Sequence, residues 1–379
     1  MSKYAIAGLG VTHQGLIPDT SAEKLAWDAV ELAIADCGID RRDLNGYIFQ
    51  PGFGAGAAGM AASRAGLGAN VTLQINSSGA TGIISIASAI GLIEAGTADY
   101  VVCVHATNAR SQTLTIGADE ENEHAVFGLF SPGAQCALMA QSYFHKYQTS
   151  SADLAEIAVA LRSNAVPRQD AFRSNKPISV ADHQDSRFIV RPLHLLDYCL
   201  VTDGAIAFIV TTKERANDLN TTPVDILGMG ACHDVGQAYG RSTNIAMGLA
   251  DFNVSPARER AFSSAGLELA DIDVFEFYDA FTIIVALQLE AYGLCAPGEA
   301  GNWIRTGNFR WNSRSPCNTS GTLHSWGYVQ GFTHVAEAVR QLRGEGGATQ
   351  VPDARTALVT NVGITGAGQA QSVVIMGAQ

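Results

Sequence analysis

The 379-residue sequence has no Cys-x-x-Cys pair, no long apolar run and little charge. Its seven cysteines are an odd number without metal or redox spacing, which argues against a zinc site and a disulfide framework. We therefore expect a reduced, cytoplasmic protein. The most apolar helical stretch, residues 80–92, is too short to cross a bilayer. The first residues also lack the pattern of a signal peptide, so we expect no membrane insertion.

Positive charge is scarce as well. Charged residues make up 16% of the chain, and the formal net charge is −12, which disfavours nucleic acid and anionic lipid as partners. The low charge suggests that much surface is buried, in part between subunits. The run from Glu120 to His124 contains possible metal ligands, but such a run is typical of a solvated loop. We predict no metal site in this chain.

Two segments of the chain repeat in style. Ser21 precedes a predicted helix that ends at Gly38, and Ser255 precedes another that ends at Gly266. Serine at the start and glycine at the end are the usual helix boundaries. A predicted strand follows each helix, at residues 46–50 and 274–277.

A second repeat is sharper. The motif Asn-Ser-Ser-Gly at 76–79 precedes an apolar helix at 80–94 and a strand at 100–105, and Asn-Thr-Ser-Gly at 318–321 precedes a helix-rich stretch and a strand at 356–361. Matched β-α-β elements predict a duplicated α/β fold. The first half spans residues 1–215, with an inserted loop segment at about 107–200, and the second half spans 220–379. Long insertions are usually functional loops.

Several motifs, in order, carry a family resemblance: Ser186–Leu193, Thr202–Ala205, Tyr278–Thr282, Asn318–Gly321 and Glu337–Gly344. Together they resemble thiolases of the sterol-carrier-protein-X and lipid-transfer-protein type. The resemblance implies the five-layered αβαβα thiolase fold with an inserted loop domain. It also implies a homodimer that takes a coenzyme A thioester as substrate and needs no cofactor of its own.

The sequence departs from that family where thiolase chemistry takes place. The nucleophilic cysteine falls on Asn76, whose amide cannot become a thiolate. The Gly-His-Pro motif falls on 327–329, so Tyr328 replaces the activating histidine, and Tyr278 begins the segment that matches Asn-Glu-Ala-Phe. The second thiolase cysteine is also missing. Two tyrosines therefore occupy former catalytic positions.

This pattern is similar to the steroid side-chain-cleaving aldolases of the lipid-transfer-protein group. The resemblance implies retro-aldol cleavage of a β-hydroxyacyl-CoA with a bulky acyl group, giving a ketone and a short acyl-CoA, propionyl-CoA by analogy. It further implies a complex with a zinc-ribbon and OB-fold domain attached to an enoyl-CoA hydratase, with zinc only in that partner.

A retro-aldol reaction needs a base for the β-hydroxyl proton, stabilisation of the enolate and an acid for the α-carbon. A phenol has an ordinary pKa of about 10 and must be tuned or act in concert. We expect helix starts at Gly79 and Gly321 to lower that pKa and to hold the enolate oxygen. Tyr328 is the predicted base because it replaces the thiolase base, and Tyr278 is the acid or oxyanion donor.

Four neighbours have two readings each. Asp279 is either a partner behind the site or the cap of a helix that begins at Ala280. His324 shares a helical face with Tyr328 and bonds its phenol if that segment is helical, or is a loop histidine. Asn76 orients the ligand or bonds the loop backbone. Ser77 caps a helix or replaces the lost nucleophile, although no histidine motif remains to activate it.

Basic residues exceed acidic ones, six to three, in residues 160–192. Such an excess suits the phosphates of coenzyme A. The predicted substrate-binding residues are Ser77, Gly79, Asn318, Gly321, Arg173 and Arg187. Two other functions stay open: a thiolase-like acetyl-CoA acyltransferase that uses Ser77 or an unplaced cysteine, and a non-catalytic acyl-CoA-binding subunit.

Overall fold

One long mixed sheet dominates the computed structural model, which describes residues 2–52, 66–114, 131–234, 252, 254–363 and 369–379. Its strand order is β3-β2-β4-β7-β1-β8-β11-β10-β9. The strands are β1 (Tyr4–Val11), β2 (Gly46–Gln50), β3 (Val71–Gln74), β4 (Val101–Thr107), β7 (Gly204–Thr212), β8 (Val224–Asp234), β9 (Val274–Glu276), β10 (Thr356–Gly363) and β11 (Gln369–Ala378).

The two ends of this sheet come from the two ends of the chain. Strands β1 to β4 and β7 all precede residue 213, and β8 to β11 all follow residue 223. Only two residue pairs, Ala5 with Asp225 and Ile6 with Val224, join β1 to β8. The sheet thus consists of two sets of strands with a narrow junction.

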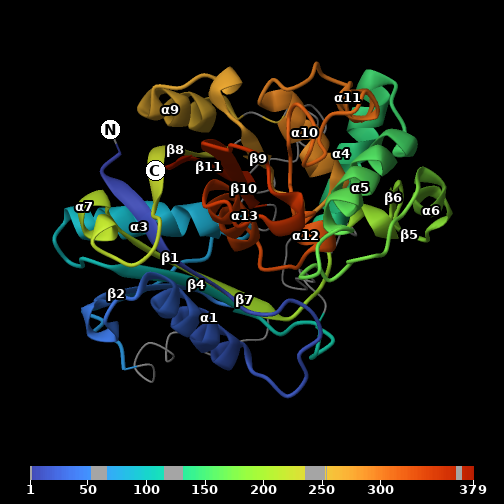
Figure 1. The fold of residues 1–379 in the computed structure, drawn as a ribbon. Helices are drawn as coiled ribbons and strands as arrows, with labels where there is room; N and C mark the ends of the chain where they lie inside the picture. Colours follow the sequence, from blue (N-terminus) through green and yellow to red (C-terminus); the bar gives the residue numbers. More distant parts are fainter. Residues whose placement is uncertain (1, 53–65, 115–130, 235–251, 253, 364–368) are drawn as a thin grey trace.

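Helices cover and separate these two sets of strands. Helix α1 (Ala22–Cys37) packs on β1, β4 and β7, and α9 (Ser255–Ala265) packs on β8 and β11. Helices α3 (Thr81–Glu94) and α13 (Phe332–Leu342) contact strands of both sets. Figure 1 shows α9 and α1 outside and α3 and α13 between. This is the expected five-layered αβαβα arrangement.

Helix ends follow the sequence signals, with one exception. The Ser21 side chain accepts a hydrogen bond from the Lys24 N–H and so caps α1. Helices α1 and α9 end at Gly38 and Gly266, whose φ angles of 71° and 67° favour glycine. The prediction that Ser255 is a cap was wrong, because Ser255 is the first residue of α9 itself.

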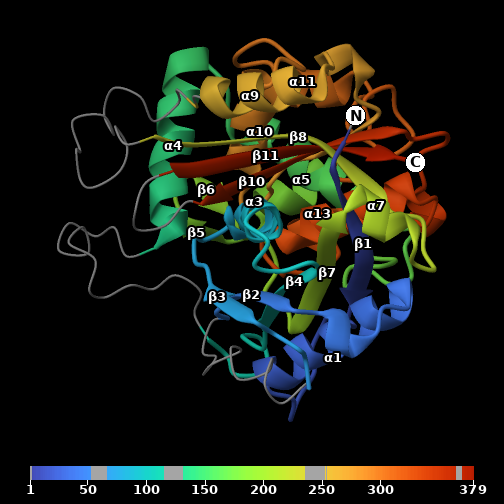
Figure 2. The ribbon, with the colours of Figure 1, turned by 90° about the vertical axis from the view of Figure 1, so that its left-hand side faces the viewer.

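The inserted segment packs against the second half of the chain. It contains α4 (Pro132–Tyr147), α5 (Ser151–Ala165), α6 (Val180–Asp185) and the hairpin of β5 (Phe188–Val190) with β6 (Leu193–His194). Helix α5 contacts α10 (Thr282–Ala291), α11 (Ala300–Arg305) and α12 (Thr322–Ser325). Figure 2 shows α4 along one edge of the molecule. The insertion therefore borders the segments that carry the predicted tyrosines.

The remaining short elements are α7 (Lys213–Asn217) and the 3₁₀ helices Arg41–Asp43, Leu195–Asp197, Leu269–Asp271 and Gly347–Thr349. None of the described helices combines the length and apolarity needed to cross a bilayer.

Candidate active site

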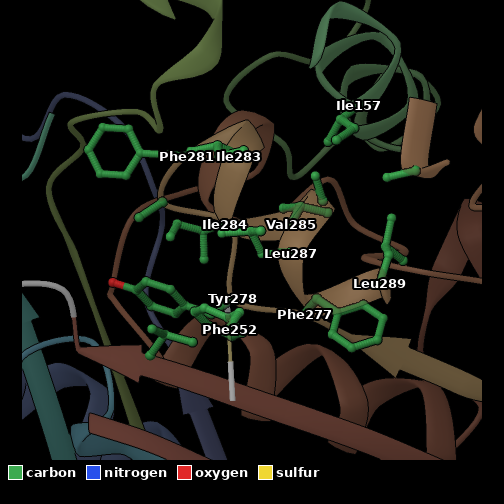
Figure 3. Packing of buried hydrophobic residues seen from close by; sticks show 14 of the residues in the cluster. Ile157, Phe252, Phe277, Tyr278, Phe281, Ile283, Ile284, Val285, Leu287 and Leu289 are labelled. Carbon is green, nitrogen blue, oxygen red and sulfur yellow. The ribbon is translucent and has the colours of Figure 1, made fainter. Parts of the chain in front are cut away.

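Three loops bring the predicted catalytic residues together. Tyr278 follows β9, Tyr328 lies between α12 and α13, and Gly79 lies just before α3. A Cβ atom added to Gly79 would overlap the hydroxyl of Tyr278 and the carbonyl of Val362, so the phenol lies directly on this loop. Figure 3 shows the Tyr278 hydroxyl pointing away from the apolar side chains of Leu287 and Leu289. The start of the central helix is thus in contact with a phenol.

The two phenols form an interacting buried pair. Tyr278 is 3% exposed and Tyr328 is 5% exposed. Burial raises the pKa of both phenols well above 10, and the charge of an ionised Tyr328 raises the pKa of Tyr278 further. The expectation that helix starts lower a phenol pKa was therefore wrong, because burial outweighs them. Both groups are neutral phenols at neutral pH.

The surroundings of the two phenols differ. A hydrogen bond with the Gln330 side chain lowers the pKa of Tyr328 and partly opposes burial. Cys199 raises the pKa of both phenols, and Asp279 adds to the rise for Tyr278. Environments that separate the pKa values of two titrating groups are typical of an acid and base pair. The hydrogen bond with Gln330 therefore favours loss of a proton from Tyr328.

Gln330 belongs to a buried amide pair that sequence reasoning missed. The Gln50 amide donates to the Gln330 side-chain oxygen and to the carbonyl of Ser78, at 3.1 Å in the second case. The pair thus ties the end of β2 to the loop before α3 and to the segment of Tyr328. Gln330 has a φ of 47°, an unusual backbone conformation for a non-glycine residue.

Asp279 is a buried partner behind the site. Its carboxylate accepts the N–H groups of Leu323 at 3.1 Å and His324 at 3.2 Å, and lies 2.8 Å from Nε2 of His334. Burial alone would raise the pKa of Asp279, but the hydrogen bond from His334 and the nearby histidines leave it lowered. The carboxylate is therefore ionised and holds the start of α12. The alternative that it caps a helix beginning at Ala280 was wrong, since α10 begins at Thr282.

His324 does not have the predicted helical relation to Tyr328. Helix α12 ends at Ser325, so the two residues do not share a helical face. Nε2 of His324 is buried and has no hydrogen-bond partner among the described residues. Burial lowers the pKa of His324, so the ring is neutral at neutral pH.

The loop before α3 is held by its own polar groups. The Asn76 side chain accepts the N–H of Ser78 at 3.1 Å, so it bonds the loop backbone, as in the second of its two readings. The Ser77 N–H donates to the hydroxyl of Thr81 at 2.8 Å. The Gly79 N–H makes no hydrogen bond to a described residue. It is therefore a donor that is available to a ligand beside Tyr278.

Asn318 and Gly321 serve the second loop itself. Asn318 is fully buried, and its amide bonds the N–H and carbonyl of Phe277 at 3.1 and 2.6 Å. The Gly321 N–H donates to the Asn318 carbonyl at 2.8 Å, so it is not free to hold an enolate oxygen. Both residues shape the loop that follows β9, and ligand contact by either one stays a prediction.

Arg173 belongs to a cluster of basic side chains. Its guanidinium and that of Arg110 each lie 5.0 Å from the centre of the Phe172 ring. The nearby Arg162 donates to Ser325 Oγ and to the carbonyl of Lys176. Burial, followed by the charge of Arg173, lowers the pKa of Arg162 to about 10. No carboxylate among the described residues pairs with these three arginines, so the cluster can accept an anion.

This arginine cluster (Arg110, Arg162 and Arg173) adjoins the segment of Tyr328. The Arg173 N–H donates to the carbonyl of Ser325, three residues before Tyr328. Arg110 donates to the carbonyl of Val201, and the neighbouring Thr202 hydroxyl accepts the Tyr328 N–H. Arg187, by contrast, is exposed at the start of the β5–β6 hairpin and, among the described residues, forms no hydrogen bond with the cluster.

Known proteins align with this chain along nearly its whole length. A family model described as thiolase C-terminal domain-like matches residues 236–378. The steroid side-chain-cleaving aldolase of Thermomonospora curvata is 34% identical, over 99% of this chain and 97% of the relative. The 17-hydroxy-3-oxo-4-pregnene-20-carboxyl-CoA lyase of Mycobacterium tuberculosis is 35% identical, over 90% and 91%. The chain belongs to the thiolase-fold family of steroid side-chain-cleaving aldolases.

Solved structures agree with membership in the aldolase family. The Ltp2–ChsH2(DUF35) aldolase superimposes with a TM-score of 0.87 at 33% identity, covering 99% of this chain and 98% of that one. Human mitochondrial 3-ketoacyl-CoA thiolase has a TM-score of 0.73 at 16% identity, which shows the shared fold alone. The aldolase family thus keeps the thiolase architecture.

Cys199, which lies beside the two tyrosines in this aldolase-family chain, is not a poised nucleophile. Cys199 influences the pKa of both phenols, and its own N–H donates to the Ala280 carbonyl at 3.0 Å. Burial raises the pKa of its thiol far above 9. A thiol that stays protonated is a poor nucleophile. Cys317 is also buried.

Possible metal ligands do not gather within the described residues: no group of three or more His, Cys, Asp or Glu side chains is placed to hold an ion there. The run Glu120–His124 lies outside the described residues.

Proposed function

We propose that this chain cleaves the bond between the α-carbon and the hydroxyl-bearing β-carbon of a steroidal β-hydroxyacyl-CoA. Membership in the aldolase family supports this reaction class. The observation that carries the proposal is the pair of buried phenols, one of them resting on Gly79 at the start of α3. In a carboxyl-CoA side chain of three carbons, this cut gives a steroid ketone and propionyl-CoA.

Tyr328 is the proposed base. As the carbon–carbon bond breaks, the β-hydroxyl proton passes to Tyr328 and the hydroxyl carbon becomes a ketone. Because burial raises the pKa of the phenol, this transfer must be concerted with loss of a proton from Tyr328, or follow its ionisation. The hydrogen bond with Gln330 favours the ionised form.

Tyr278 is the proposed acid. The bond-breaking electrons form a thioester enolate, which needs a hydrogen-bond donor for its oxygen and a proton for its α-carbon. The Gly79 N–H supplies the donor, in a buried place where such bonds are strong. The Tyr278 phenol supplies the proton, since its surroundings keep it protonated.

The arginine cluster is the proposed site for the phosphates of the coenzyme A ester, which is substrate and not cofactor. Guanidinium groups bind phosphate oxygens with paired, charge-assisted hydrogen bonds. In a chain of net charge −12, three arginines without a carboxylate partner among the described residues are a local exception. Of the two predicted arginines, the contacts described above support Arg173 ahead of Arg187 as a phosphate ligand.

We also propose a homodimer and a complex with a second protein. Strand β3 lies at the edge of the sheet, and its side chains alternate between half-buried and exposed. Such an edge is usually covered, and a second copy of this chain suits it. The name of the Ltp2–ChsH2(DUF35) structure records two components, which supports a second protein as partner, and a zinc-ribbon and OB-fold domain is the partner that the family resemblance implies. Native mass measurement after co-expression tests both assemblies.

The proposed compartment is the cytoplasm. All seven cysteines are free thiols in the structure. Free thiols are usual where glutathione keeps proteins reduced.

One assay separates this proposal from its two alternatives. A tertiary β-hydroxyacyl-CoA is incubated with the protein, with and without free coenzyme A and the candidate partner. Ketone release that does not depend on free coenzyme A supports the aldolase, and release that requires it supports a thiolase-like acyltransferase. Tight binding of the ester without turnover in any mixture indicates a non-catalytic subunit.

A further inference from the structure

His334 is a buried histidine with one ring nitrogen in use and one without a partner. Its side chain is fully buried, and Nε2 lies 2.8 Å from the Asp279 carboxylate. Because an ionised carboxylate only accepts hydrogen bonds, Nε2 must carry a proton. The other nitrogen, Nδ1, has no partner among the described residues. A buried polar atom without a partner is unfavourable, so a functional partner is expected there.

His334 lies beside the ring of Tyr278. The rings of the two residues have centres 5.4 Å apart. His334 also lies three residues after Gly331, where an added Cβ would overlap the carbonyl of Gly79. Residues three apart share a helix face, so the first turn of α13 presents His334 towards the loop that the Tyr278 hydroxyl contacts.

The groups around His334 are suited to a histidine that holds and releases one proton. The Asp279 carboxylate is a fixed negative charge beside His334, since it is held by two backbone N–H groups and has no arginine or lysine partner among the described residues. His324 lies beside the same carboxylate with its Nε2 unpaired. A proton on Nδ1 therefore has a fixed counter-charge behind it.

We propose that His334, oriented by Asp279, is a positioning residue that returns a proton to Tyr278 after each turnover. This inference rests on the proposed aldolase function. Once the Tyr278 phenol has given its proton to the enolate α-carbon, the Nδ1–H bond of imidazolium breaks. The proton passes to the phenolate oxygen of Tyr278, leaving phenol and neutral imidazole. His334 then regains a proton from solvent or from the ketone-forming side of the site.

The test is rapid mixing of His334→Gln with substrate. The glutamine amide keeps an N–H donor towards Asp279 but holds no exchangeable store. We expect a first turnover at close to the wild-type rate, a burst of one ketone per site, and steady-state turnover slowed about 100-fold. Equal slowing of the first and later turnovers, or no slowing of either, would overturn the proposal.

His183→Gln is the matched control, since His183 and Asp197 form a second buried pair 2.9 Å apart. It should show no burst. If either variant fails to fold, ¹⁵N NMR of histidine in the wild-type protein decides instead. The proposal requires the neutral His334 ring to carry its proton on Nε2, and a proton on Nδ1 with a bare Nε2 would overturn it. Wild-type protein without ketone release refutes the aldolase function itself, which this NMR result does not depend on.

Discussion

The hydroxyl of Tyr278 rests against Gly79, so closely that only a residue without a side chain fits between the phenol and the carbonyl of Val362. This contact places a phenol at the start of the central helix α3, where the related thiolases have their nucleophile. A side chain at this one position would therefore disturb both the backbone packing and the position of the Tyr278 phenol.

Replacing Gly79 with alanine tests that contact. The added Cβ would displace the phenol, and we expect ketone release to fall at least about 100-fold, as for a misplaced catalytic group. Gly91→Ala is the control: it lies in the same helix, a Cβ there meets nothing within 4 Å, and the change should stabilise the fold by about 1 kcal/mol. Activity of Gly79→Ala equal to that of Gly91→Ala would refute the contact's role.

Removal of the Cys199 sulfur should leave the reaction intact. We expect Cys199→Ala to keep its turnover within about threefold of wild type, because a thiol that stays protonated takes no covalent part. Steady-state kinetics without free coenzyme A measures this. Abolished turnover, together with inactivation of the wild type by iodoacetamide at neutral pH, would point to a cysteine mechanism.

The arginine cluster predicts a binding defect without a chemical one. Arg173→Ala should raise KM for the coenzyme A ester about 10- to 100-fold at unchanged kcat, since a charge-assisted hydrogen bond contributes about 1.5–3 kcal/mol. The wild-type KM should also rise with salt. Arg187→Ala serves as the comparison and should have a smaller effect. A larger KM change in Arg187→Ala would move the phosphate site to the β5–β6 hairpin.

A buried carboxyl pair predicts how stability changes with pH. Burial, and then the charge of Glu337, raises the pKa of Glu276 well above 4.5. The unfolded chain releases this proton from about pH 4.5 upward while the folded chain keeps it, so the stabilisation is complete at low pH and is lost as pH rises.

Glu276→Gln should remove that loss, since the amide carries no charge at any pH. Urea unfolding at pH 5 and pH 8 measures the free energy of unfolding of both proteins. Between pH 5 and pH 8, we expect the free energy of unfolding of the variant to rise relative to that of the wild type. The rise should be about 1.4 kcal/mol for each unit by which the pKa of Glu276 is raised within this range. Parallel curves would show that Glu276 is ionised in the folded protein.

Local sequence signals predicted the fold well. Glycine stops and apolar periodicity located α1 and α3, and the repeated Asn-x-Ser-Gly loops located the two central helix entries. The error at Ser255 arose because proline at position 256 favours the first turn equally well when the helix begins one residue earlier.

The site was only partly predictable, because its polar contacts join residues far apart in the chain. His334 meets Asp279 across 55 positions, and Gln50 meets Gln330 across 280. No spacing rule connects such pairs. The rise in the phenol pKa values was missed for a similar reason, since burial depends on the whole assembly of layers around Tyr278 and Tyr328.

The most direct test of the two-phenol account is ketone release by Tyr278→Phe, Tyr328→Phe and Tyr292→Phe, assayed without free coenzyme A. Tyr292 is equally buried in the same apolar cluster and is the control. We predict that the first two variants bind the ester but release ketone at least about 100-fold more slowly, while Tyr292→Phe remains active. Wild-type rates in either Tyr278→Phe or Tyr328→Phe would contradict the account.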